Sequence, residues 1–230
     1  MKTLIEYDDN AINPRIECDN IGTMVCFHRR YGLGDKHSHA NPEDAVVDIA
    51  SKLNANYAEW VGYTRYPDDQ QVEQGQALID KHCVTLPLHL YDHSGITMST
   101  SRFSCSWDSG QVGFIYMTHK TMRENWPETT HTHEQAVAAA EACLETEVKV
   151  YDQYLTGDVW CVSVVDDEGD VLDSCCGFFG YKYAEKDGAR MLADCEAEAA
   201  ERAEQEAEAT LKEEAEYQYW AERDVITKPD

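Results

Sequence analysis

The chain has 230 residues, and its 19 Lys and Arg against 44 Asp and Glu give a formal net charge of −25. A hydrophobic fraction of 43% and 13 tyrosines indicate a folded protein and exclude an acidic disordered chain. No apolar stretch approaches the roughly 20 residues that span a bilayer, and the surplus of carboxylates excludes direct binding to a phosphate backbone.

The first predicted elements are a short strand and two helices. Residues 1–20 are polar and predict no regular structure, whereas GTMVCFH at 22–28 is typical of a buried strand. A helix is predicted to begin after Asn41, because Asn caps helices, Pro42 suits the first turn and acidic residues follow. A second helix is predicted over residues 69–82.

Strands and one clear helix follow. Strands are predicted over 83–93, where Pro87 favours an edge position or a bulge, and over 111–118. Thr132 begins a helix whose apolar positions step by three or four residues until Gly157 ends it. The turn DDEG then joins VWCVSVV to DVLDSCCGFFG, which predicts a β-hairpin.

The C-terminal segment is acidic and helical. Residues 194–230 hold 13 acids and 4 bases, and no Gly or Pro interrupts 189–228, so a long helix with a thin alanine stripe is predicted. The elements together predict an α+β protein with a mainly antiparallel sheet. We expect a core domain over 1–185, with the 132–155 helix on one face, and an acidic helical extension over 186–230.

Nine cysteines form an odd set without paired spacing. The N-terminal residues MKTLIEYDDN lack the apolar core of a signal peptide, so we expect a cytoplasmic protein with free thiols. Cys175 and Cys176 point to opposite faces of a strand and cannot jointly hold a metal ion. Two His-x-His pairs lack a third ligand at zinc spacing, so neither a metal site nor a cofactor is predicted.

The loop over residues 92–108 holds the residues of an alternative, catalytic interpretation. A cysteine nucleophile needs an imidazole to hold it as thiolate and a third group to orient that imidazole; the loop offers Cys105, His93 and Asp92 or Asp108. No GxSxG elbow or cysteine-protease signature accompanies them. The preferred interpretation is therefore a structural loop, held by Asx and Ser turns around a buried Trp107, and a catalytic site is the alternative.

The acidic surplus favours a binding function. Solubilisation, adaptation to high salt and mimicry of nucleic acid compete as explanations. A net charge of −25 exceeds the roughly 2–8 charges that keep a small domain soluble, but for the C-terminal helix alone a solvated segment that only keeps the protein soluble is an alternative. Residues 194–224 as a helix would span about 46 Å with one net charge per roughly 5 Å, against one per about 1.7 Å in DNA. The helix therefore needs neighbouring acids to approach the charge density of DNA. The candidate partner-binding acids are Glu198, Glu201, Glu204 and Glu208 of the helix and Asp166, Asp167 and Glu168 of the hairpin turn.

Three sequence blocks, in this order, resemble a group of largely uncharacterised phage and mobile-element proteins: NPRIECDNIGTMVCFHRRYGLGDKH, LPLHLYDHSGITMSTSRFSCSWDSGQVGFIY and EVKVYDQYLTGDVW. The resemblance covers about residues 13–180 and supplies no catalytic residues. It implies a small accessory protein in the cytoplasm of a bacterial host. Together with the charge, it predicts an inhibitor of a host nucleic-acid-binding defence complex, of anti-CRISPR or anti-restriction type, that blocks or mimics nucleic acid. The alternatives are a small hydrolase-like enzyme using the 92–108 loop and an interaction or scaffold protein using the C-terminal helix.

Overall fold

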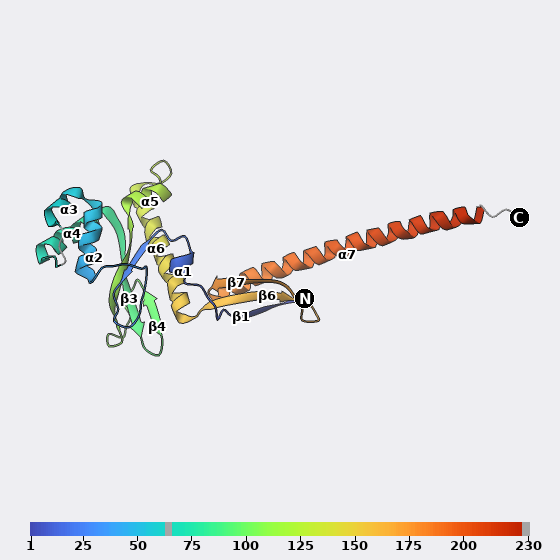
Figure 1. The fold of residues 1–230 in the computed structure, drawn as a ribbon, viewed down its shortest axis with the longest axis horizontal. Coiled ribbons are helices and arrows are strands. Elements are labelled where there is room, and N and C mark those ends of the chain that lie inside the picture. The colour runs from blue at the N-terminus through green and yellow to red at the C-terminus, as the bar shows by residue number, and fades with distance from the viewer. Residues whose placement is uncertain (63–65, 227–230) are drawn as a thin grey trace. The chain divides into compact units, whose positions relative to one another are not determined.

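The protein is α+β, with antiparallel sheets and a long C-terminal helix (Figure 1). The computed structural model describes residues 1–62 and 66–226. Contacts group the chain into two compact units. The core unit is Asn10–Asp158, and the α7 unit is Met1–Asp9 together with Val159–Asp230. The contacts thus divide the chain differently from its composition, which changes near residue 185.

The core unit is built on a four-stranded antiparallel sheet in the order β2-β5-β3-β4. These strands are β2 (Thr23–Cys26), β3 (Cys83–Asp92), β4 (Ile96–Ser99) and β5 (Ser109–Thr118). The strands predicted over 22–28, 83–93 and 111–118 are confirmed. β4 pairs with β3 only from His89 onward, and the register of β3 with β5 shifts between Leu88 and His89. Pro87 therefore lies beside a bulge, as its missing N–H predicts.

Helices cover both faces of this sheet (Figure 1). On one face, α6 (His133–Thr156) packs Leu144 against Ile115 of β5. On the other face, α2 (Pro42–Leu53) and α4 (Asp69–His82) join the core that contains Val25 of β2. The described residues of this unit also form the shorter helices α1 (Pro14–Glu17), α3 (Ala55–Val61) and α5 (His119–Asn125).

The predicted helix boundaries are confirmed by their caps. The Asn41 side chain accepts a hydrogen bond from the backbone N–H of Asp44 at the start of α2. Thr132 and Gln135 form a capping box at the start of α6. Gly157 ends α6 with φ of 75°, a left-handed conformation that favours glycine. Side chains close to a helix end therefore decide where these helices begin and end.

The α7 unit has its own antiparallel sheet, in the order β1-β6-β7. Its strands are β1 (Lys2–Tyr7), β6 (Val159–Val165) and β7 (Val171–Phe179), and α7 (Tyr181–Ile226) packs on them. Val162 and Val164 of β6 form a buried cluster with Ala184 and Met191 of α7. A Cβ at Gly188 would lie 3.1 Å from Val162 Cγ1, so this glycine allows α7 to approach the sheet closely.

Two expectations about the sheet are wrong. The five predicted strands form two sheets rather than one, and residues 2–7, expected to be irregular, form the edge strand β1. In KTLIEY the half-buried Thr3 and Ile5 alternate with exposed neighbours. This period of two identifies a strand, but the polar composition of the segment conceals it. Pairing between segments more than 150 residues apart has no local signal.

The expectation that all cysteines are free thiols is wrong for one pair. Cys161 of β6 and Cys176 of β7 form a disulfide, with their Cα atoms 4.0 Å apart. The other seven cysteines are free. The sequence does not reveal the pair, because the position opposite Cys161 depends on a bulge in the register of β6 with β7.

Candidate functional site

The most distinctive surface of the protein is the outer part of α7. Leu192, Cys195 and Ala199 are still partly buried, whereas every residue from Ala200 to Trp220 is exposed. Figure 1 shows α7 continuing past its sheet as a single helix. Residues 194–220 include ten acidic and two basic residues, so this segment has a net charge of 2 − 10 = −8. We name residues 194–220 the acidic segment.

The four helix acids predicted to bind a partner share one side of the acidic segment. At 3.6 residues per turn, Glu198, Glu201, Glu204 and Glu208 fall within an arc of about 120°. All four are exposed. Glu208 pairs with Lys212 at 2.7 Å, and Glu201 accepts a hydrogen bond from Gln205 at 3.3 Å. An exposed pair of this kind contributes about 0.3–0.5 kcal/mol, so a cationic partner can replace Lys212.

The hairpin turn between β6 and β7 holds the other predicted acids, and two of them are already engaged. Asp166 Oδ1 accepts hydrogen bonds from the backbone N–H groups of Glu168, Gly169 and Asp170, at 2.9, 2.8 and 2.9 Å. These bonds, led by that from Asp170, lower the pKa of Asp166. Asp167 lies 3.0 Å from the amino group of Met1. Asp166 therefore shapes the turn instead of presenting a free carboxylate.

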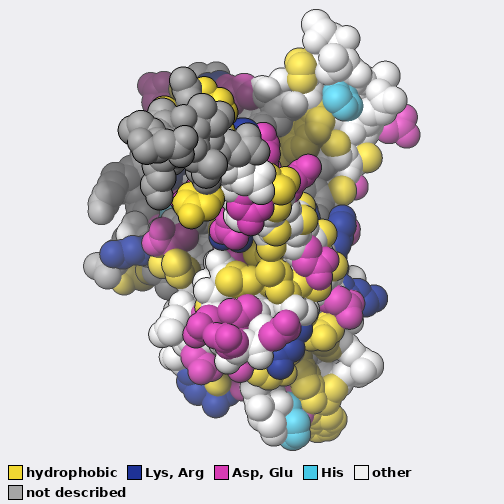
Figure 2. All heavy atoms as spheres, turned by 90° about the vertical axis from the view of Figure 1, so that its right-hand side faces the viewer, with side chains coloured by type: hydrophobic (Ala, Val, Ile, Leu, Met, Phe, Trp, Pro, Cys, Tyr) yellow, Lys and Arg dark blue, Asp and Glu magenta, His cyan; other side chains and the backbone are white. Residues whose placement is uncertain are grey.

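Acids of β7 and α7 influence the same partly buried thiol, that of Cys195. Burial raises the pKa of Cys195, and the negative charges of Asp173, Glu198 and Asp194 raise it further. Asp173 of β7 therefore lies near the start of the acidic segment. Figure 2 looks toward the end of α7, with Asp and Glu side chains in magenta. The strand can thus add negative charge to that of the helix.

The 92–108 loop brings three of its candidate residues together, but in an unsuitable order. The Cys105 thiol donates to Asp108 Oδ2 at 3.7 Å, and His93 Nδ1 lies 3.5 Å from the same oxygen. Among the described residues, the thiol hydrogen-bonds to no histidine. In an activated nucleophile the imidazole lies between the thiol and the carboxylate, whereas here the carboxylate of Asp108 lies between Cys105 and His93. The fourth candidate, Asp92, forms an ion pair with Arg30.

The buried position expected for Trp107 is wrong, because 94% of this residue is exposed. Its loop leaves the sheet after Ser99 and returns at Ser109. The backbone N–H of Asp92 donates to the carbonyl of Asp108 at 2.8 Å, and the Ser109 hydroxyl donates to the carbonyl of Cys105. Polar turns therefore hold the loop, as the structural interpretation predicts, but without an aromatic core.

The best-connected buried charge was not predicted from the sequence. Only 1% of the Arg15 side chain is exposed. Arg15 forms two bonds to Asp35 at 2.8 Å and one to Glu147 at 2.7 Å, and it also donates to Asn20 and to the carbonyl of Gly22. Burial lowers the pKa of Arg15, but its bonds to Asp35 and Glu147 raise it overall. All five N–H donors have partners, so this network is structural.

Comparison with protein-family models, with curated proteins and with solved structures finds no match in any of the three. The resemblance to phage and mobile-element proteins therefore stays a prediction. No described helix combines the length and apolarity needed to cross a bilayer. The fold and surface define an α+β protein with an exposed acidic helix, and that surface is the basis of the functional proposal.

Proposed function

We propose that this chain is a non-enzymatic binding protein whose acidic segment occupies the positively charged groove of a nucleic-acid-binding partner. The observation that carries the proposal is the outer part of α7, where residues 200–220 are all exposed and the acidic segment has a net charge of −8. In proteins most helical stability comes from packing an amphipathic face. Because residues 200–220 are exposed on every side of the helix, this segment can present its whole circumference to a partner.

The charge density favours a composite surface. The acidic segment spans about 39 Å at 1.5 Å per residue, so it carries one net charge per roughly 5 Å. Duplex DNA carries one charge per about 1.7 Å of axis. Asp173 of β7 raises the local density where the helix leaves its sheet. We expect this strand acid to contribute to binding together with the glutamates of α7.

The partner class follows from the charge and from the sequence blocks. A groove that binds nucleic acid concentrates Lys and Arg, and carboxylates can occupy the places of phosphates there. The resemblance to phage and mobile-element proteins supports a bacterial defence complex as the partner. The protein is then an inhibitor of anti-CRISPR or anti-restriction type, and it competes with the nucleic acid that the complex normally binds.

The end of α7 favours a second candidate, an interaction helix that pairs with an apolar surface. Leu211, Tyr217, Tyr219 and Trp220 are 54–75% exposed. Aromatic residues of this kind are enriched where interfaces gain most of their energy. The two candidates use the same helix but differ in their response to salt, because apolar contacts are not screened by ions.

The test is capture of partners from a bacterial lysate by the immobilised full-length chain, with a chain ending at Ala199 as the control. We expect the full chain to retain nucleic-acid-binding proteins that the truncated chain loses, and duplex DNA or structured RNA to release them. Retention should fall as salt rises from 50 to 300 mM, since exposed charges are screened beyond about 8–10 Å. Equal retention by both chains, or release by neither salt nor nucleic acid, contradicts the proposal.

A further inference from the structure

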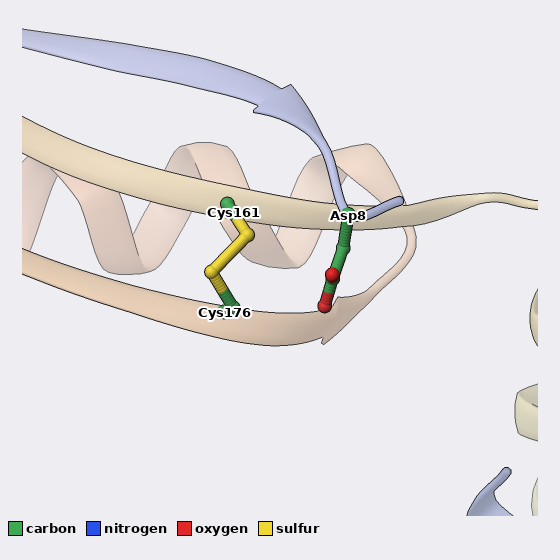
Figure 3. A group of neighbouring side chains, drawn as sticks. All are labelled: Asp8, Cys161 and Cys176. Atoms are coloured by element: carbon green, nitrogen blue, oxygen red, sulfur yellow. A yellow bond between two sulfur atoms is a disulfide. The ribbon is translucent and has the colours of Figure 1, made fainter. Parts of the chain in front are cut away.

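A carboxylate lies beside the disulfide of the α7 unit (Figure 3). Cys161 belongs to β6 and Cys176 to β7, and Asp8 directly follows β1, so the three residues come from three segments of the chain. The two sulfur atoms and a carboxylate oxygen of Asp8 all lie within 4.8 Å of one another. Cys176 is exposed, and the other two residues are half-buried. Segments far apart in the sequence thus bring two sulfur atoms and one oxygen to a place that solvent reaches.

We propose that the reduced form of this pair binds one divalent transition-metal ion, with Cys161, Cys176 and Asp8 as ligands and Zn²⁺ as the preferred ion. Thiolate and carboxylate are both established zinc ligands, and thiolates select zinc over magnesium and calcium. Three protein ligands leave the fourth tetrahedral position to water. The site does not depend on what the acidic segment binds.

The disulfide and the metal complex are alternative states of the same two sulfurs. Reduction by a thiol reductant adds two electrons and two protons, breaks the S–S bond and gives two thiols, while the reductant becomes a disulfide. Binding of Zn²⁺ then displaces both thiol protons into solvent. The metal is bound only when the pair is reduced, so a change in redox conditions exchanges a covalent crosslink for an ion.

The backbone prepares this arrangement. Trp160 pairs with Phe178 and Val162 with Cys175, so Cys161 faces two residues of β7, Cys176 and Gly177. Such a bulge re-aims side chains, and Gly177 has φ of +83°, which favours glycine. The bulge places Cys176 on the same side as Cys161.

Asp8 is held at this place by the backbone as well. Its N–H donates to the carbonyl of Val159 at 2.9 Å, which ties the residue after β1 to the start of β6. The high negative charge of the chain also concentrates cations around it. A cation that reaches the reduced site therefore finds its ligands fixed on neighbouring strands.

The test uses the full-length protein, reduced with a phosphine, and Co²⁺ as a spectroscopic substitute for Zn²⁺. We expect thiolate-to-cobalt charge-transfer absorption that Zn²⁺ abolishes on titration, and we expect none from the oxidised protein. Affinity should rise with pH, because the ligands must lose protons. Cys176→Ser and Asp8→Asn should each weaken binding at least about tenfold, since even a partner of a ligand changes affinity by about 10–100-fold.

Matched controls separate this site from the other thiols and acids. Cys175→Ser alters the neighbouring free thiol of β7, and Asp9→Asn alters the exposed acid that follows Asp8; both should bind Co²⁺ as the wild type does. Alkylation mapped by mass spectrometry needs no variant: Zn²⁺ should protect Cys161 and Cys176 and leave Cys175 reactive. Absence of charge transfer in the reduced wild type, or equal losses in Cys175→Ser and Cys176→Ser, overturns the proposal and leaves the pair as a disulfide only.

Discussion

α6 and α7 are both long helices rich in alanine and glutamate, but only in α6 do buried residues continue along most of the helix. Leu144, Val148 and Tyr151 of α6 are at most 2% exposed and pack against the sheet of the core unit. In α7 the last buried residue is Met191, and Leu211, placed within the apolar stripe, is 66% exposed. Similar compositions therefore give one helix that stabilises a fold and one that is available to a partner.

The difference lies in the size of the side chains on one stripe. Full burial of a Leu, Val or Ile side chain contributes about 1.5–3 kcal/mol, and a stripe of alanines contributes much less. The outer part of α7 depends instead on the helix propensity of Ala and Glu and on pairs such as Glu208–Lys212, worth about 0.2–0.5 kcal/mol each. A helix stabilised in this way can be long and highly charged, because it does not need to pack against a hydrophobic core.

The largest expected difference between the two helices is in the stability lost when one glutamate is removed from each. Glu147→Ala in α6 takes a 2.7 Å ion pair from buried Arg15, and it removes the acceptor for the N–H groups of Ile21 and Gly22. We expect a loss of about 3–5 kcal/mol in the free energy of unfolding, measured by urea denaturation. Glu208→Ala in α7 loses an exposed pair and should cost about 0.3–0.5 kcal/mol. Comparable losses in the two variants would remove the distinction between the helices.

A leucine in each helix gives the next largest contrast. Leu144 is fully buried, so Leu144→Ala should lower the free energy of unfolding by about 2–5 kcal/mol through lost burial and the cavity left behind. Leu211→Ala should change it by less than about 0.5 kcal/mol. Urea midpoints at constant slope measure both. A cost above about 2 kcal/mol for Leu211→Ala would mean that the outer part of α7 is packed in the free protein.

Local signals predicted the start of α2 and both ends of α6, and long-range contacts escaped prediction. Asn41, Thr132 and Gly157 act within four residues of themselves, so the sequence alone identifies them as helix boundaries. By contrast, Arg15 meets Asp35 and Glu147 across 20 and 132 residues. No pattern in a single sequence marks such a pairing, and the same holds for the division of the strands into two sheets.

The candidate site likewise has features that the sequence predicted and features that it did not. Composition alone predicted that the glutamates of the acidic segment are exposed, because a helix with so few large apolar residues has no face to bury. Composition could not show that Asp166 folds back onto its own turn, since that depends on backbone N–H groups presented by Glu168, Gly169 and Asp170. Nor could it show that Asp108, and not His93, lies next to Cys105.

Charge neutralisation tests whether the acidic segment or the hairpin turn binds the captured partner. Each exposed carboxylate is expected to contribute about 0.5 kcal/mol, so single Gln substitutions should weaken binding about twofold. The combined Glu198, Glu201, Glu204 and Glu208 variant should weaken it roughly 30-fold and flatten its salt dependence. Binding is measured by titration at two salt concentrations. The matched variant, with Asp167→Asn and Glu168→Gln in the turn, should lose less; the reverse ranking would assign binding to the turn.

The smallest effects concern two aspartates whose pKa values move in opposite directions. Burial raises the pKa of Asp152 in α6, although a hydrogen bond from the N–H of Met98 partly offsets this. Its ionised form therefore weakens the fold, and this penalty is present at pH 7 and disappears as pH falls toward about 3.9, the usual unfolded value.

In the β6–β7 turn, backbone N–H groups lower the pKa of Asp166. Its contribution is stabilising above about pH 3.9 and is lost as pH falls through the lowered folded value. Asp152→Asn should therefore raise the urea midpoint at pH 7 or leave it unchanged, and Asp166→Asn should lower it slightly. Both differences should shrink on acidification, and a variant pair that shifts in the same direction at pH 7 would show that the two carboxylates do not differ in this way.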